Sequence, residues 1–360
     1  MSSSLPETMK AVVFHGPKKV AVEERPVPQV RDPKDVIVKV QATALCGSEL
    51  HVFRGHQNSP TGFIMGHEFV GHIVSVGSSV KTLQVGDKVV SPFTTSCSEC
   101  FYCHHNHSSR CAHSLLFGSE RLDGGQAEYV RIPHGEGTLT VAPAAVSDQA
   151  LILMADIFPT GFFGAKNAFK LLEHSNQKPS EAVVVVVGCG PVGLCAIISA
   201  LEYKPKHLFA VDSVPSRLEL AKKLGAEPLN FLGDGGKEKM LERVKEVTEG
   251  RGADAVIEVV GLSPALRTAF DLLRPFGVIS SIGVHNAEVP WSGDEAYGKN
   301  LRIQMGRCPV KSIFDEALPV LAKNQDRLSF MFDKVMPLAD AVEGYDLFDQ
   351  MKVQKVIFTP

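Results

Sequence analysis

A run of five valines followed at once by a glycine-rich turn constrains the fold more than any other feature. Residues 183–187 are continuously β-branched, which is typical of a central parallel strand covered on both faces. Residues 188–193 follow the pattern G-x-G-x-x-G and lead into an apolar segment of helical length. A strand, a tight turn and a helix in this order predict one βα unit of a doubly wound parallel sheet.

The chain divides into three segments by its pattern of short apolar runs. In residues 1–158, Gly, Pro and Asp turns separate the runs, which predicts a β-rich lobe of barrel or sandwich type; the expected strands are 9–14, 36–40, 69–76 and 88–90. In residues 159–307, expected strands and helices alternate, which predicts the parallel sheet. The expected strands are 183–187, 208–211, 255–260 and 278–282, and the expected helices are 191–202 and 215–224. Residues 308–360, with a helix at 317–321 and an extended segment at 353–358, are expected to return to the first lobe.

The glycine motif predicts a dinucleotide site. Gly188 permits the tight turn, Gly190 lets a pyrophosphate approach the backbone, and Gly193 allows the helix to pack closely on the strand. The helix that begins at Pro191 and Val192 offers free N–H groups and a positive dipole end to the phosphates. We therefore expect these five residues to bind the cofactor.

Asp212 predicts which dinucleotide is bound. It follows the second expected strand, 19 residues after Gly193. A carboxylate there accepts hydrogen bonds from the adenosine ribose hydroxyls and repels a 2′-phosphate, so NAD is favoured over NADP. Arg217 would weaken this preference, and without the glycine motif Asp212 would be a helix N-cap or a solvated loop acid. Val284 is also expected among the cofactor contacts.

Four cysteines with the spacing C-x2-C-x2-C-x7-C predict a structural zinc site; they are Cys97, Cys100, Cys103 and Cys111. Four thiolates can surround one tetrahedral Zn²⁺ and leave no position for water or substrate. The loop is rich in polar residues, so it has little core of its own and would need a metal to order it. Ordinary thiols in a flexible loop, or an iron–sulfur cluster, are the alternatives.

A second metal site is predicted by Cys46 and His67, which lie outside this quartet. Either residue alone is more often a buried thiol or a hydrogen-bonded histidine than a ligand. Together they supply two of the three protein ligands that a catalytic zinc uses, with one position kept for water or substrate. Glu68 and Asp156 are the candidates for the third ligand. Asp156 lies in an apolar run, where a carboxylate is costly unless it is paired or metal-bound.

Composition and charge exclude several classes of partner. The 360 residues carry a formal net charge of -3 with a pI of about 6.5, so no general attraction to nucleic acid or anionic membranes is expected. Residues 182–201 are uncharged over a length that could span a membrane, but their glycines and proline fit the strand, turn and helix better. Eight cysteines without a secretory signal sequence indicate a reducing compartment, so a cytoplasmic location is expected.

Six motifs occur in an order that identifies a family. They are residues 46–51 (C-G-S-E-L-H), residues 66–68 (G-H-E), the cysteine quartet, residues 123–129 (D-G-G-Q-A-E-Y), the apolar run around Asp156, and the glycine motif. From about residue 9 to residue 358 the chain resembles the zinc-containing alcohol dehydrogenases of the medium-chain dehydrogenase/reductase superfamily. Residues 123–129 are also similar to formaldehyde and polyol dehydrogenases. Any single motif is only suggestive, whereas the ordered set is highly specific.

This resemblance implies two domains and two zinc ions per subunit. The fold would be a GroES-like (chaperonin-10-like) β-rich catalytic domain joined to a Rossmann domain, with the active-site cleft between them. Cys46, His67 and Asp156 would hold the catalytic zinc, and Glu68 would be the nearby acid that can transiently ligate it. Asp156 stands where the family often has cysteine. The cysteine quartet would hold the structural zinc.

The resemblance also implies roles for the other motif residues. Ser48 would hydrogen-bond the alcohol oxygen, and His51, near the cofactor ribose, would pass the proton towards solvent. Glu49, which stands where a shorter aspartate is common, would orient His67. Phe93, Leu116 and Phe158 are candidate walls of the substrate pocket, and Trp291 is a candidate for its entrance or a subunit contact; each could equally belong to ordinary core.

The expected function is reversible hydride transfer between a small-molecule alcohol and NAD, with an aldehyde or ketone as the product. Two alternatives remain: a biosynthetic reductase of an activated C=C or C=N bond on the same scaffold, and a nucleotide-binding protein without turnover. Intact Ser48 and His51 argue against the first, and intact metal and glycine motifs against the second. The short segment 111–124 resembles the tetrameric microbial branch, so a homotetramer is favoured over a dimer. An apolar pocket distinguishes one methylene only weakly, so the sequence does not name the alcohol.

Overall fold

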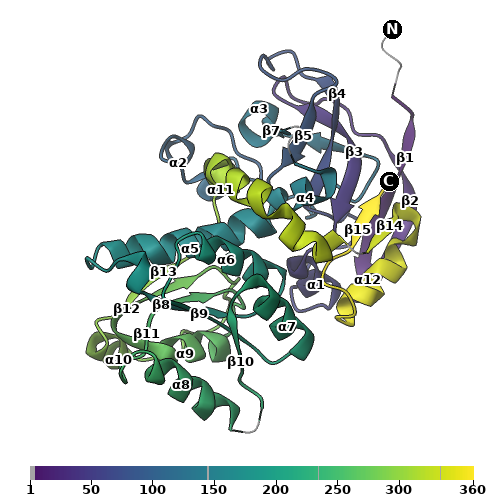
Figure 1. Ribbon diagram of the computed structural model, residues 1–360. Coiled ribbons are helices and arrows are strands. Elements are labelled where there is room, and N and C mark those ends of the chain that lie inside the picture. The colour runs from purple at the N-terminus through teal and green to yellow at the C-terminus, as the bar shows by residue number, and fades with distance from the viewer. Residues whose placement is uncertain (1–4, 144–145, 234, 333) are drawn as a thin grey trace. The chain divides into compact units, whose positions relative to one another are not determined.

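The chain folds into two compact units in the computed structural model, which describes residues 5–143, 146–233, 235–332 and 334–360. Unit 1 comprises Met1–Asp156 and Pro309–Pro360, and unit 2 comprises Ile157–Cys308 (Figure 1). Within the described residues no helix is both long enough and apolar enough to cross a membrane. The uncharged segment 182–201 forms a strand, a turn and a helix instead.

Unit 2 is built on a six-stranded sheet in which every strand is parallel to its neighbours. Its order is β10-β9-β8-β11-β12-β13, and the strands are β8 (Val183–Val187), β9 (His207–Asp212), β10 (Glu227–Asn230), β11 (Ala253–Glu258), β12 (Leu273–Ser281) and β13 (Arg302–Met305). All five valines of β8 are buried, as expected for a central strand. The chain runs outward from β8 to β10 and then returns to β11 on the other side of β8. This reversal places the topological switch point, where such sheets bind ligands, at the carboxyl ends of β8 and β11.

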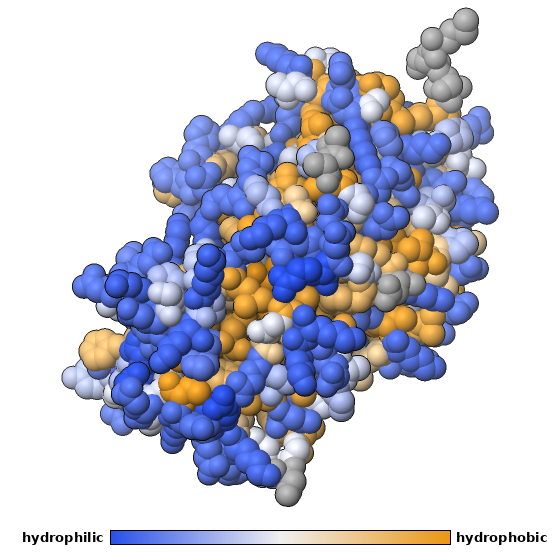
Figure 2. Space-filling view, in the orientation of Figure 1, coloured by the Kyte–Doolittle hydropathy of each residue, from blue (hydrophilic) through white to orange (hydrophobic). Residues whose placement is uncertain are grey.

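Helices cover both faces of this sheet (Figure 1). On one face lie α5 (Ile157–Glu173), α6 (Pro191–Leu201) and α7 (Pro215–Leu224), and on the other lie α8 (Gly236–Glu246) and α9 (Ser263–Leu272). Unit 2 also has two short helical elements, α10 (Gly293–Gly298) and the 3₁₀ helix η3 (Pro179–Glu181). Helix α7 ends at Gly225, whose φ of 105° is a left-handed conformation that glycine adopts without strain. The solvent side of α8 is hydrophilic (Figure 2), because its lysines and glutamates surround the buried Met240 and Val244.

Unit 1 is rich in short strands, as the turn pattern predicts. A hairpin of β1 (Thr8–Gly16) and β2 (Lys19–Pro26) accompanies a seven-stranded sheet with the order β14-β15-β3-β4-β5-β7, in which β6 also pairs with β3. The sheet strands are β3 (Val36–Ala44), β4 (Glu68–Val76), β5 (Lys88–Ser91), β6 (Tyr129–Ile132), β7 (Thr140–Val141), β14 (Val335–Pro337) and β15 (Ile357–Thr359). The helices are α1 (Gly47–Phe53), α2 (Phe101–His104), α3 (Gly135–Thr138), α4 (Asp148–Ile152), α11 (Val310–Asn324) and α12 (Ala341–Asp349), with 3₁₀ helices η1 (Ser108–Arg110), η2 (Leu153–Ala155), η4 (Gln325–Phe332) and η5 (Leu338–Asp340).

The C-terminal segment completes unit 1. Strand β15 pairs antiparallel with β3, so that Ile357 lies opposite Ala44. The prediction that 317–321 is helical is confirmed, but the helix is longer and spans Val310–Asn324, because buried apolar residues recur at helical spacing along all of it. The expected extended segment 353–358 is a strand only over Ile357–Thr359, where the chain pairs with β3 and β14.

Candidate metal and cofactor sites

Four side chains of unit 1 that can ligate a metal meet in one cluster: Cys46, His67, Glu68 and Asp156. One ligand atom of each lies within 4.8 Å of those of the others. Asp156 Oδ2 lies 3.5 Å from Cys46 Sγ and 3.4 Å from His67 Nε2. Zinc bonds of about 2.0–2.3 Å in a tetrahedron place neighbouring ligand atoms about 3.4–3.6 Å apart. The distances therefore fit one zinc ion held by these three residues.

The charges in this cluster also suit a cation. Burial raises the pKa of the Cys46 thiol, and the neighbouring carboxylates of Glu68 and Asp156 raise it further. The pKa of His67 lies well above its usual value: burial lowers it, but Glu49 and Cys46 raise it by more. Several acidic groups around one imidazole thus favour an added positive charge, which a bound metal would supply.

Lys355 belongs to this cluster, although the sequence reasoning missed it. Its ammonium forms an ion pair with Glu68 Oε2 and donates a hydrogen bond to the Leu45 carbonyl at 3.1 Å. The other carboxylate oxygen, Glu68 Oε1, is buried and has no hydrogen-bond partner. Burial raises the pKa of Glu68 to about 7, although the Lys355 charge opposes this shift. A single charge in the otherwise uncharged segment 353–358 is the sequence signal that could have found Lys355.

Helix α1 carries Ser48 and Glu49. Cys46 is its N-cap residue, and the Glu49 carboxylate accepts a hydrogen bond from the Cys46 N–H at 2.9 Å. The Ser48 hydroxyl lies 3.4 Å from both Cys46 Sγ and His67 Nε2, so it adjoins the position of a bound metal. Glu49 Oε1 lies 3.8 Å from His67 Nδ1, on the other side of the imidazole ring.

His51 follows Ser48 by one turn of α1 and lies at the surface of unit 1. Partial burial and the nearby charges of His56 and Arg54 lower the pKa of His51, so its imidazole is neutral at pH 7 and can accept a proton. Within the part of the chain that the structure describes, Ser48 and His51 form no direct hydrogen bond. A proton that passes from one to the other therefore needs a bridging group between them.

The cysteine quartet forms a second cluster in unit 1, made of Cys97, Cys100, Cys103 and Cys111. All four are free thiols, so no disulfide competes for the sulfurs. Sγ atoms of Cys97 and Cys111 lie 3.5 Å apart, and those of Cys100 and Cys103 lie 3.6 Å apart. A zinc tetrahedron with bonds of about 2.3 Å predicts about 3.8 Å. The backbone N–H groups of Glu99 and His113 donate to two of the sulfurs at 3.4 Å, which stabilises thiolates.

The glycine motif of unit 2 lies directly after β8, at the switch point. Gly188 has a φ of 98°, and a Cβ at Gly193 would lie 1.8 Å from the Gly188 carbonyl oxygen, so glycine is required there. A Cβ at Gly190 would meet nothing within 4 Å, which leaves this stretch of backbone open to a ligand. Pro191 and Val192 begin α6, whose first N–H groups have no partner within the helix.

Asp212 ends β9, and backbone N–H groups already donate to most of the acceptor positions of its carboxylate. The carboxylate accepts hydrogen bonds from the N–H groups of Cys189 at 2.7 Å, Ser213 at 2.7 Å and Val214 at 2.9 Å. Arg217 lies 4.0 Å away. A carboxylate has about four lone-pair sites, so one remains for a further donor. Asp212 thus joins the glycine turn to the next loop, a structural role that the sequence reasoning did not anticipate.

Glu258 is a second residue that the sequence reasoning missed. It is buried at the end of β11, and its carboxylate accepts hydrogen bonds from the N–H groups of Val260 and Gly261 and from the Ser281 hydroxyl, all at 2.7 Å. These bonds fix the loops that follow β11 and β12. Val284 lies exposed in the second of these loops.

The candidate pocket residues have different surroundings. The Phe93 ring lies edge to face with the ring of the cluster histidine, with centroids 6.2 Å apart. Leu116 is half-buried and Phe158 is fully buried. Trp291 stacks on Phe270 with centroids 5.0 Å apart, at the edge of the unit 2 core. Phe93 is therefore the candidate that borders the metal cluster.

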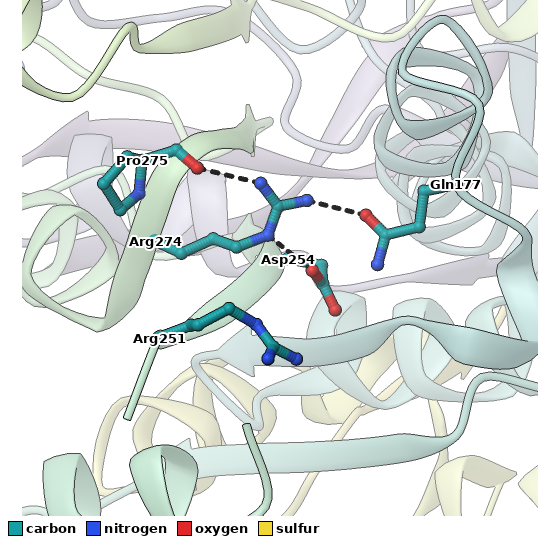
Figure 3. A pocket seen from close by; sticks show the side chains of 5 residues that line it. All are labelled: Gln177, Arg251, Asp254, Arg274 and Pro275. Atoms are coloured by element: carbon teal, nitrogen blue, oxygen red, sulfur yellow. Dashed lines mark hydrogen bonds and ion pairs between the residues drawn. The ribbon is translucent and has the colours of Figure 1, made fainter. Parts of the chain in front are cut away.

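Unit 2 has a pocket at the amino ends of its sheet strands, whereas the glycine turn lies at their carboxyl ends. The pocket is lined by Gln177, Arg251, Asp254, Arg274 and Pro275. Figure 3 shows the Arg274 guanidinium pointing at three acceptors. They are Asp254 Oδ1 at 2.6 Å, Gln177 Oε1 at 2.7 Å and the Pro275 carbonyl at 2.8 Å. The charge of Arg274 is thus used to join chain segments, and the pocket is separate from the glycine turn.

Comparison with known proteins identifies the family. Residues 32–143 match the alcohol dehydrogenase GroES-like domain, and residues 191–323 match the zinc-binding dehydrogenase family. Over 350 residues the chain is 66% identical to zinc-type alcohol dehydrogenase B of Aspergillus flavus, covering 97% of this chain and 81% of the relative. The alcohol dehydrogenase TADH from Thermus sp. ATN1 has a TM-score of 0.89 and 34% identity, covering 98% of this chain and 99% of that one. An alcohol dehydrogenase from E. coli CFT073, complexed with NADH, has a TM-score of 0.82 and 25% identity, covering 99% and 100%.

A doubly wound sheet and a GroES-like β-rich unit in one chain define the medium-chain dehydrogenase/reductase class. The chain belongs to the zinc-containing alcohol dehydrogenase family of this superfamily. The predicted family and the predicted fold class, a Rossmann sheet plus a GroES-like domain, are both confirmed. The protein is an oxidoreductase of a zinc-binding family.

Proposed function

We propose that this protein is a zinc- and NAD-dependent alcohol dehydrogenase that acts reversibly on an alcohol and its aldehyde or ketone. The observation that carries the proposal is the cluster of Cys46, His67 and Asp156, in which Asp156 Oδ2 has the separations from Cys46 Sγ and His67 Nε2 that a zinc tetrahedron requires. Three protein ligands leave one position for substrate. The cysteine quartet would hold a second, structural zinc in a closed site.

In this proposal the residues of unit 1 orient the alcohol and move its proton. When bound, the zinc is a Lewis acid that acidifies the hydroxyl of an alcohol. Ser48, whose hydroxyl adjoins both Cys46 and His67, would accept the proton of that hydroxyl while its own hydroxyl proton passes through a bridging group towards His51. His51, which is neutral and at the surface, takes the proton on and releases it to solvent. The unpartnered oxygen of Glu68 can ligate the metal transiently while Lys355 holds the other oxygen.

NAD is the proposed cofactor, since it supplies the hydride acceptor that an alcohol dehydrogenase requires. The carboxylate of Asp212 has one lone-pair site left for a ribose hydroxyl, and its negative charge disfavours a 2′-phosphate. The glycine turn and the start of α6 would bind the pyrophosphate, and Val284 would contact the cofactor from its loop. The relative from E. coli that is complexed with NADH supports this choice.

We also propose a homotetramer in the cytoplasm. Strand β13 is an edge of the unit 2 sheet and exposes the apolar side chains of Ile303 and Met305 (38% and 41%). An exposed apolar edge strand tends to pair with another chain, which supports self-association. The eight cysteines form no disulfide within the described residues, which supports a reducing compartment.

The test measures nicotinamide absorbance during incubation with NAD or NADP and a panel of primary, secondary, aromatic and polyol alcohols. An aldehyde-reduction arm and a chelator-treated control accompany it. Turnover that is linked to NAD and lost with the chelator supports the proposal. If zinc and NAD bind but no alcohol or aldehyde reacts, the protein reduces an activated C=C or C=N bond or has no turnover.

Two substitutions separate the proposed roles of the metal ligands and the relay. Asp156→Ala should reduce the zinc content from two ions per chain to one, because a carboxylate ligand is lost. Ser48→Ala should keep both ions but reduce turnover by about 10²–10⁴-fold, the usual contribution of a positioned proton-transfer group. Zinc content by elemental analysis and turnover with the best alcohol are the measurements. Near-normal turnover in Ser48→Ala would exclude Ser48 from the relay.

A further inference from the structure

We propose that Gln126 and Tyr345 are positioning residues of the catalytic metal site, where a buried chain of hydrogen bonds through them fixes Glu49 against His67. This inference rests on the proposed function, because it concerns the metal that His67 would hold. It also gives a role to the motif D-G-G-Q-A-E-Y at residues 123–129, which the proposed chemistry does not use.

The chain of contacts lies wholly within unit 1. The Tyr345 hydroxyl donates to Gln126 Oε1 at 2.9 Å. Gln126 Nε2 then donates to the Glu49 carboxylate, at 3.3 Å to Oε1 and 3.4 Å to Oε2. Glu49 Oε1 lies 3.8 Å from His67 Nδ1, and His67 presents its other nitrogen, Nε2, to Asp156. Tyr345 and Gln126 are 0% exposed and Glu49 and His67 are 5% exposed, so water does not compete with these contacts.

The observed arrangement satisfies every group. The amide nitrogen of Gln126 faces Glu49 and donates to its carboxylate oxygens. The amide oxygen then faces Tyr345, whose hydroxyl must be the donor. Burial and the charge of Glu49 raise the pKa of Tyr345 well above its usual value, which keeps this hydroxyl protonated. Tyr345 therefore sets the orientation of the Gln126 amide.

The backbone of the motif holds Gln126 next to the residues that precede His67. The N–H groups of Gly124 and Gln126 donate to the carbonyls of Ile64 and Met65 at 2.8 and 2.9 Å. A Cβ on Gly124 would lie 2.1 Å from the carbonyl oxygen of Gly66, so a larger residue would push the two segments apart. The glycines of the motif thus allow the close approach that brings Gln126 to Glu49.

Glu49 needs this support because its side chain has several rotatable bonds. The backbone of Cys46 and Gly66 already donates to this carboxylate, the Cys46 N–H at 2.9 Å. Gln126 adds a side-chain donor that reaches both carboxylate oxygens and so fixes the direction of the carboxylate towards His67. A hydrogen-bonded carboxylate beside the free nitrogen of a metal-binding histidine orients the ring and strengthens metal binding.

The test is the rate at which zinc passes from the holoenzyme to an excess of a chromophoric chelator. The Asp156→Ala variant should lack the catalytic zinc, so the release phase that is absent from this variant is assigned to the catalytic zinc. Tyr345→Phe keeps the ring, which packs on Phe53, and removes only the hydroxyl. This variant should release the catalytic zinc about tenfold faster. Loss of a group that hydrogen-bonds to a metal ligand usually weakens metal binding or activity by about 10–100-fold, and tenfold is the lower end of that range. The structural zinc should leave at the wild-type rate, and Co²⁺ in the catalytic site should show an altered visible spectrum.

Two further variants keep the inference falsifiable. Tyr129→Phe, which removes the hydroxyl of another buried tyrosine of unit 1, should leave both release rates within twofold of wild type. Gln126→Met should accelerate release at least as much as Tyr345→Phe, and the double variant should add nothing, because both changes break one chain. Equal catalytic-zinc release in wild type and Tyr345→Phe, or equal acceleration of both zinc ions, would overturn this inference alone. A wild-type protein that binds a single zinc would overturn the proposed function as well.

Discussion

Lys355 and Glu68 show at the residue scale how much of the metal cluster depends on buried charge. Both side chains are almost completely buried, at 1% and 0% exposure. Two charges withdrawn from water stay ionised only while each neutralises the other, so the loss of one partner leaves the second without compensation. Lys355 also donates to the Leu45 carbonyl, directly before the proposed ligand Cys46. The ion pair therefore joins the C-terminal segment to two neighbours of the metal site.

Lys355→Met should destabilise the protein by on the order of 3 kcal/mol, because it leaves the Glu68 carboxylate buried and unpaired. The double variant Lys355→Met/Glu68→Gln should recover more than half of this loss, since neither buried charge then remains. Urea unfolding of the zinc-loaded proteins, followed by circular dichroism, gives both values. Equal stability of the single and double variants would show that Lys355 acts through packing rather than through charge.

The residues that the sequence predicted and those it missed differ in how their partners are brought together. Cys46, His67 and Asp156 could be predicted as ligands because their residue types have specific metal chemistry and recognisable local motifs, and the structure brings them together. Lys355 is 287 residues from Glu68 along the chain, and Tyr345 is 219 residues from Gln126. Only the register of the C-terminal segment in the folded unit creates these pairs. No local pattern of residue types carries that information.

At the scale of elements, the cysteine lobe between Ser96 and Ala112 has almost no apolar core. Cys97 and Cys111 are its only buried residues that count as hydrophobic, and the aromatic side chains of Phe101 and Tyr102 are exposed. Its helices α2 and η1 have four and three residues, too few to be stable alone. The structural zinc proposed for the quartet would therefore supply most of the free energy that orders this lobe.

Cys100→Ser should remove the structural zinc and make the lobe sensitive to proteases near Phe101 and Tyr102. NAD binding to unit 2 should stay within twofold of wild type, because that unit has its own core. His104→Ala is the matched control: it changes an exposed histidine of the same lobe and should keep both zinc ions. Limited proteolysis and zinc content are the measurements. Two zinc ions in Cys100→Ser, or one in His104→Ala, would contradict the quartet assignment.

Two elements with a strong local pattern were predicted well, whereas an edge strand was not. The buried strand β8 and the capped helix α7 have strong local signals in their β-branched run and terminal glycine. Strand β13 was not predicted because it lies at the edge of the sheet, where a strand buries fewer side chains. None of its four residues is fully buried, so its sequence lacks the apolar pattern of a central strand. The extent of β15 was wrong because its pairing with β3, rather than its own residues, decides where it starts.

At the scale of the whole molecule, the C-terminal segment forms ion pairs with residues near the start of the chain, within unit 1. Asp349, at the end of α12, pairs with Lys18 in the β1–β2 turn and with Arg54 at the end of α1. The Arg54 guanidinium donates to Asp349 Oδ1 at 2.6 Å and to the Asp349 carbonyl at 2.9 Å. The hydrogen bonds and charges of Lys18 and Arg54 lower the pKa of Asp349 below its ordinary value. The ionised carboxylate therefore favours the folded state.

The contribution of this network should vary with pH in a defined direction. Because the pKa of Asp349 is lower in the folded than in the unfolded chain, its stabilisation is complete above the unfolded value of about 3.9 and is lost as the pH falls through the folded value. Asp349→Asn should lower the free energy of unfolding by about 0.5–1 kcal/mol between pH 5 and pH 8, a typical value for a partly exposed ion pair. The acid-unfolding curves of the variant and wild type, measured by circular dichroism, should converge below about pH 4. Asp346→Asn changes an exposed aspartate of the same helix and should follow the wild-type curve throughout. A difference between Asp349→Asn and wild type that persists undiminished at the lowest pH would show that shape and neutral hydrogen bonds, rather than charge, hold the C-terminal segment in place.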